Sequence, residues 1–139
     1  MKTAHLLRRV IRACVDDERT LQHEQRFVDD ARRSGTLGRL VRERRQFLQD
    51  LTKLAAPGQS GPTGSWAELL REVGRSLQVA AGGRNSKDAI ASCRHSRART
   101  EASYDRALEA SWPAETQRVL EFQRGRLQEE TRELNGLVV

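Results

Sequence analysis

Polar side chains interrupt the apolar stripe of a long helix predicted at the amino end of the chain. No glycine or proline occurs between Ala4 and Ala31. One row of mostly apolar residues repeats every seven positions, at Leu7, Cys14, Leu21 and Val28. A second row, which completes an a/d stripe, reads Ala4, Ile11, Glu18 and Gln25. A buried carboxylate is costly unless a cation, a metal ion or several donors meet it, so the partner of Glu18 is the central question.

The other long predicted helices also carry polar residues near the middle of their apolar stripes. With Glu18, the predicted polar core layer consists of Glu18, Arg44, Arg97, Gln123 and Glu130. Charge pairing predicts that Glu18 meets Arg97 or Arg44 and that Glu130 meets the other arginine. Such a layer is better attested as a device that fixes helix register than as a source of stability.

The same positions disfavour a metal centre. A di-iron site in a four-helix bundle needs Glu-x-x-His on two of its helices, and the chain has no such motif. The nearest substitute is Glu43-x-x-Gln46, in which a neutral amide is a weak ligand. Two guanidinium groups, which do not deprotonate, would also repel a dication. We therefore expect no metal and no cofactor, with iron or manganese binding kept as an alternative.

Cys14 and Cys93 are the only cysteines, and their spacing indicates neither a zinc site nor a disulfide framework. Both fall within predicted helices, where a small buried apolar role is the simpler interpretation. A redox thiol is the alternative, because Arg12, Arg94 and Arg97 are near in sequence and positive charge lowers a thiol pKa.

Composition limits the class of protein. The 139 residues fit one domain, residues 1–139, with 37% hydrophobic and 32% charged residues and a net charge of +6. That charge raises a nucleic-acid hypothesis, but acidic residues are interspersed with the arginines and aromatic residues are few, which argues against it. Arginines interrupt the first apolar stretch, so no signal peptide or membrane span is predicted. The expected location is the cytoplasm, with reduced thiols.

Helix periodicity and breakers divide the chain into five helices. The predicted ranges are 3–34, 37–55, 66–80, 86–111 and 113–136. Gly35 is expected to end the first helix, Asn85 or Ser86 to begin the fourth, and Pro113 to open the fifth. Residues 57–64, PGQSGPTG, form a loop. The prediction is an all-α four-helix bundle of two helical hairpins, joined by a long crossover that carries the short helix 66–80.

Several short motifs occur together over residues 5–135. They are Cys14-x-Asp16-x-Glu18, Arg44-x-x-Phe47-x-x-x-Leu51, Gly64-Ser65, Cys93 with Tyr104-x-x-Ala107-Leu108, and Gln123-x-x-x-Leu127. In their order and spacing the chain resembles the bacterial ferritin-like four-helix-bundle proteins of unknown function. That family has a glutamate where this chain has Arg97, and commonly a histidine near Thr131. Glu18 matches the family pattern, and the other two positions depart from it.

The resemblance implies a non-catalytic ferritin-like protein, stress-associated as family members often are, that acts through a protein partner or as a homodimer. In this interpretation the polar layer replaces the di-metal site. The alternatives are an iron- or manganese-binding ferritin-like protein and an Arg-rich nucleic-acid-binding protein.

Overall fold

The computed structural model describes residues 2–55 and 85–138, which form four long helices and no strand. They are α1 (Lys2–Glu24), α2 (Ala31–Ala55), α4 (Ser86–Ala107) and α5 (Ala114–Gly136), with a short 3₁₀ turn, η1 (Gln25–Phe27), after α1. The all-α four-helix prediction is therefore confirmed for this part of the chain. The predicted short helix 66–80 lies outside the described residues.

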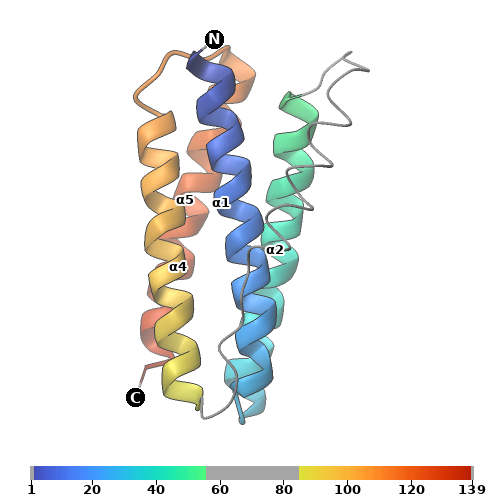
Figure 1. The fold of residues 1–139 in the computed structure, drawn as a ribbon, viewed down its shortest axis with the longest axis vertical. Coiled ribbons are helices and arrows are strands. Elements are labelled where there is room, and N and C mark those ends of the chain that lie inside the picture. Colours follow the sequence, from blue (N-terminus) through green and yellow to red (C-terminus); the bar gives the residue numbers. More distant parts are fainter. Residues whose placement is uncertain (1, 56–84, 139) are drawn as a thin grey trace.

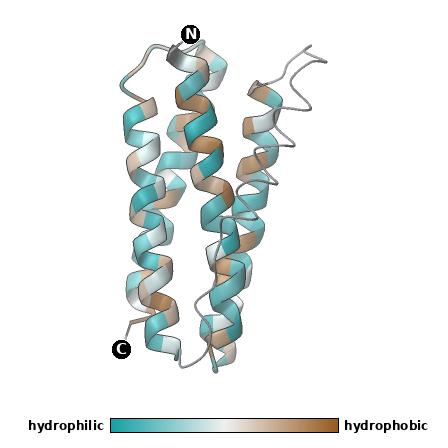
Figure 2. Cartoon of the chain, in the orientation of Figure 1, coloured by the Kyte–Doolittle hydropathy of each residue, from teal (hydrophilic) through white to brown (hydrophobic). Residues whose placement is uncertain are grey.

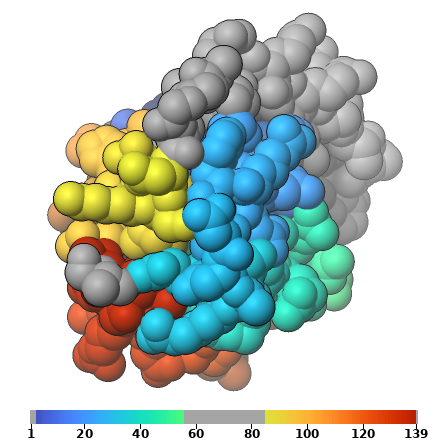
Figure 3. Space-filling model, turned by 90° about the horizontal axis from the view of Figure 1, so that it is seen from below, coloured from blue at the N-terminus to red at the C-terminus, as the bar shows by residue number. Residues whose placement is uncertain are grey.

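The four helices form a bundle in which sequential and non-sequential neighbours are all antiparallel (Figure 1). Helix α1 packs against α2 and α4, and α5 packs against α4 and α2. In the end-on view of Figure 3, α4 (yellow) lies beside α1 (blue) and α5 (red) lies beside the start of α2 (cyan). The end of α2 and the start of α4 lie at opposite ends of the bundle, as two hairpins joined by a crossover require.

The first turn lies earlier than the sequence analysis placed it. Helix α1 ends at Glu24 rather than at residue 34, and Gly35 lies inside α2. Asp30 starts α2, because its side chain accepts a hydrogen bond from the Arg33 amide at 3.0 Å. An aspartate at the N-cap satisfies an otherwise unpaired amide, so it determines the boundary here in preference to the glycine.

The remaining helix ends are set by local hydrogen bonds. The Asn85 side chain caps α4 by accepting from the Asp88 amide at 2.9 Å, which confirms the predicted start. Helix α4 ends at Ala107, four residues before the predicted residue 111. The Ala107 carbonyl at the helix end accepts two hydrogen bonds, from the Trp112 indole N–H at 2.7 Å and from the Ala110 amide at 3.0 Å. Helix α5 follows directly after Pro113.

The core consists of two apolar clusters. One lies near the start of α1 and includes Ile11, Leu51 and Leu120, and the other lies near its end and includes Leu21, Leu40 and Leu134. Polar residues dominate the outer faces of the helices (Figure 2). None of the described helices is long and apolar enough to cross a membrane.

Candidate functional site

Four charged side chains, one from each helix, lie between the two apolar clusters. They are Asp17 of α1, Arg44 of α2, Arg97 of α4 and Glu130 of α5, and each is at most 1% exposed. We refer to these four residues as the ion layer. Two guanidinium groups and two carboxyl groups meet within it, and buried ionisable groups are tolerated only when they are paired and hydrogen-bonded in this way.

Both arginines contact both carboxylates. Arg44 Nε and Arg97 Nη2 each donate to Asp17 Oδ2 at 2.9 Å. On the other side, Arg44 Nη2 donates to Glu130 Oε1, and Arg97 Nη1 lies 2.5 Å from the same oxygen. The planar guanidinium presents several N–H groups in fixed directions, so one arginine can bridge two carboxylates from different helices.

Asp17 has a further donor, and it is held in its charged form. Ser96 Oγ donates to Asp17 Oδ1 at 2.8 Å. Burial by itself raises the pKa of this carboxyl, but Arg97, Arg44 and the Ser96 hydroxyl together bring the pKa below its ordinary value. Burial likewise lowers the pKa of Arg44, and Asp17 and Glu130 more than offset it, so that the pKa is raised.

Glu130 differs from Asp17 in its surroundings. Burial raises the pKa of Glu130 to about 8, against the opposing effect of Arg44 and Arg97, and a hydrogen bond with Glu43 raises it further. Glu130 Oε2 and Glu43 Oε1 are both buried without another hydrogen-bond partner among the described residues. This arrangement suits a proton held between the two carboxyl groups, while Arg126 pairs with the other oxygen of Glu43 at 2.8 Å.

A neutral hydrogen-bonded group lies next to the ion layer. The Tyr104 hydroxyl donates to Gln123 Oε1 at 2.5 Å and lies 3.2 Å from Cys14 Sγ. Gln123 Nε2 in turn donates to the Phe47 carbonyl at 3.3 Å. The Arg44 guanidinium lies over the Phe47 ring, 4.5 Å from its centroid, and so connects the two groups.

The structure brings together three of the five residues predicted for the polar layer. Arg44, Arg97 and Glu130 meet in the ion layer, and Gln123 is buried in the adjacent neutral group. The predicted pairing of Glu18 with Arg97 or Arg44 is wrong. Glu18 is half-buried at the bundle surface, where Arg45 Nε donates to it at 2.8 Å.

Asp17 takes the place predicted for Glu18. The buried residues of α1 include Leu7, Val10, Cys14, Asp17, Leu21 and Glu24, which alternate by three and four residues. The buried stripe therefore consists of the residues that repeat every seven positions and of the residues three positions after each of them. Asp17 is the residue three positions after Cys14. The three-residue step from Cys14 does not by itself exclude Glu18, but together with Ser96 beside Arg97 on α4 it favours Asp17, and this is the signal that the sequence offers.

The thiols are buried, and we expect them to be unreactive in the folded protein. Cys14 and Cys93 are both 0% exposed, and burial raises the pKa of Cys14 to about 11. A thiol reagent such as 5,5′-dithiobis(2-nitrobenzoate) requires an accessible thiolate. We predict that the native protein at pH 8 reacts at the rate of global unfolding, and that both thiols react at once in denaturant. Fast labelling of either thiol in the native state would restore the redox interpretation.

The donor set does not fit a di-metal centre. Two arginines occupy the middle of the bundle and already pair with Asp17 and Glu130. Within residues 2–55 and 85–138, no group of three or more His, Cys, Asp or Glu side chains converges to hold a metal ion. Any dication there would face two guanidinium charges that do not dissociate.

Comparison of this chain with known protein families, with curated proteins and with solved structures found no match. The function is therefore argued from the geometry of the ion layer and not from a relative.

Proposed function

We propose that this chain is a non-catalytic ferritin-like four-helix-bundle protein in which the ion layer stands where a di-metal centre would be. The observation that carries the proposal is that each arginine bridges Asp17 and Glu130, so both carboxylates are used by the protein itself. The two-hairpin arrangement supports the ferritin-like assignment.

The position of the ion layer supports a role in specifying the bundle. Apolar residues fill the core on both sides of it, so a helix that slid by one turn would bring a charge against an apolar cluster. Burying an unpaired charge costs several kcal/mol, roughly the cost of breaking a buried pair. The layer therefore selects one register of the four helices, which is the best-attested role of buried ionic groups.

A protein of this kind acts through contacts, either with a partner protein or with a second copy of the chain. Phe122, on the outer side of α5, is 65% exposed. Aromatic side chains are enriched among residues that anchor protein interfaces, which supports a contact role for this helix. Cys14 and Cys93 are buried and not joined in a disulfide, which suits a reducing compartment, so we place the protein in the cytoplasm. A role in the stress response is part of the proposal only through the ferritin-like resemblance.

Metal analysis tests the proposal. After incubation with Mn²⁺ or with Fe²⁺ under nitrogen and removal of free ions, elemental analysis is expected to find well under one ion per chain. The comparison variant is Arg97→Glu, which replaces one cation by a third carboxylate and is expected to retain more metal than the parent protein. Circular dichroism would first establish that the variant is folded. Stoichiometric metal in the parent protein would overturn the proposal in favour of a metal-binding protein.

A further inference from the structure

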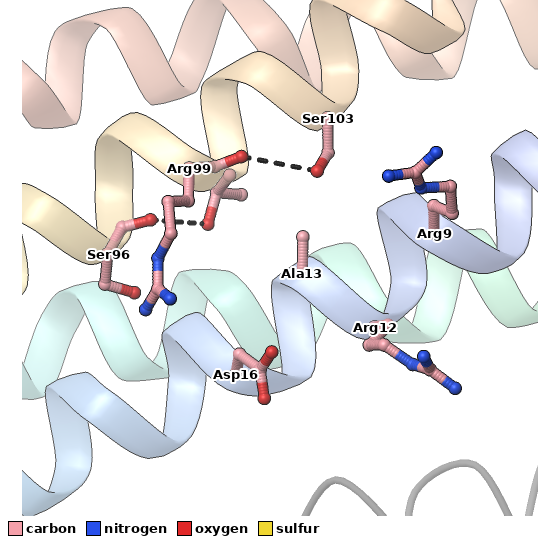
Figure 4. A pocket seen from close by; sticks show the side chains of 8 residues that line it. Arg9, Arg12, Ala13, Asp16, Ser96, Arg99 and Ser103 are labelled. Atoms are coloured by element: carbon pink, nitrogen blue, oxygen red, sulfur yellow. Dashed lines mark hydrogen bonds between the residues drawn. The ribbon is translucent and has the colours of Figure 1, made fainter. Parts of the chain in front are cut away.

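An open groove of about 250 Å³ runs between α1 and α4 on the outside of the bundle (Figure 4). It is lined by Arg9, Arg12, Ala13 and Asp16 of α1 and by Ser96, Arg99, Thr100 and Ser103 of α4. Three arginines and one aspartate give the lining a net positive charge. A concave site with fixed positive charge concentrates anions.

The arrangement of side chains leaves the centre of the groove clear. In Figure 4 the small Ala13 side chain stands between Arg9 and Arg99, with the Ser103 hydroxyl on the side of Arg9, while Arg12 points away. All three arginines are exposed, and none has a salt bridge among the described residues, although the charges of Arg99 and Arg12 act on Asp16. The Ser103 hydroxyl donates to the Arg99 carbonyl at 3.3 Å, a long hydrogen bond that an incoming acceptor can replace.

We propose that this groove binds the phosphate group of a small phosphate monoester, with Arg9 and Arg99 as the two charged contacts above Ala13. A guanidinium offers parallel N–H groups that match two phosphate oxygens, which a point charge does not. Ser103 supplies a neutral donor beside Arg9. The inference is independent of the ion layer, which faces the interior of the bundle.

The charges beyond the groove favour a compact ligand over a polymer. Asp16 lies among the lining residues on α1. The adjoining hollow, which shares Arg9 and Ser103, is lined by Asp105 and Glu109 as well as by Arg106. Successive phosphates of a nucleic acid would meet Asp105 and Glu109 as well as Asp16, whereas a single phosphate between Arg9 and Arg99 would be opposed by Asp16 alone.

Titration with inorganic phosphate and with glycerol 3-phosphate at low ionic strength, followed by NMR, tests the proposal. We expect saturable shifts confined to α1 and α4 for both probes, with the monoester bound at least as tightly as the free ion. Arg99→Ala and, as a second variant, Arg9→Ala are each expected to weaken binding about tenfold or more, because each removes a charge-assisted contact. Ala13→Leu fills the groove without a change of charge and is expected to abolish binding.

Two further variants serve as controls. Arg118→Ala removes an exposed arginine from α5, outside the groove, and should change the affinity less than twofold. Asp16→Asn removes the repelling carboxylate and should tighten binding. Equal weakening by Arg118→Ala and Arg99→Ala would show a non-specific charge effect and overturn the proposal. Tighter binding of a single-stranded oligonucleotide than of the monoester, unaffected by Ala13→Leu, would also overturn it, in favour of a nucleic-acid surface.

Discussion

Replacing Asp17 by asparagine is expected to lower the free energy of unfolding by about 3–5 kcal/mol. The amide keeps the shape of the side chain but removes the charge that Arg44 and Arg97 share through Asp17 Oδ2. The two buried guanidinium groups would then face only the carboxyl group of Glu130, whose raised pKa favours its neutral form. Urea denaturation measures the loss as a fall in the midpoint with little change in the slope.

The neighbouring Glu18→Gln variant is the matched control. It removes the same kind of charge one residue away, but the partner of Glu18 is Arg45, whose side chain is 53% exposed. Exposed ion pairs typically contribute less than about 1 kcal/mol, so this variant should be nearly as stable as the parent protein. If the two variants were equally destabilised, or if Glu18→Gln were the worse, the ion layer would not be organised around Asp17.

Stability is expected to fall as the pH rises from about 5 to about 8, because Glu130 has a raised pKa in the folded state. Its folded-state pKa of about 8 exceeds its ordinary value of 4.5, so the folded protein holds a proton that the unfolded chain releases. This contribution is fully present below pH 4.5 and is lost as the pH rises through the folded value. At about 1.4 kcal/mol per pKa unit, the upper bound of the effect is about 5 kcal/mol. The residues that face Glu130 are Arg44, Arg97 and Glu43.

Asp17 has the opposite dependence. Its pKa is lowered, so its contribution is present above its ordinary value of 3.8 and is lost as the pH falls through the folded value. Urea denaturation from pH 4 to pH 8.5 should therefore show greatest stability near about pH 5. The Glu130→Gln variant, which mimics the protonated form, should lose the decline on the alkaline side. A parent protein whose stability is flat or rises over that range, or a variant with an unchanged profile, would show that Glu130 is ionised.

The sequence predicts the bundle well because each long helix buries one narrow apolar face. The spacing of apolar residues along the chain shows directly where that face lies. The inward positions of Arg44, Arg97, Gln123 and Glu130 follow from this pattern and are buried in the structure. Asp17 could not be separated from Glu18 by periodicity alone. Both lie near the same side of α1, and the choice depends on what the partner helices present.

The turn between α1 and α2 shows a second limit of prediction from the sequence. Gly35 is a favourable helix end, but an isolated glycine inside a helix costs only about 1 kcal/mol. The Asp30 cap and the contacts of α2 with the rest of the bundle outweigh that cost. The hydrogen bond between Glu130 of α5 and Glu43 of α2 likewise has no local sequence signal, because the two residues lie on different helices.

A double-mutant cycle between Asp17→Asn and Arg44→Met tests the central claim most directly, because it isolates the interaction of two charges that lie on different helices of the bundle. If the ion layer acts as one unit, the two losses in unfolding free energy will not add, and the coupling energy will be about 2–3 kcal/mol. Additive losses, equal to their sum within about 0.5 kcal/mol, would contradict the account, since Asp17 and Arg44 would then not depend on each other.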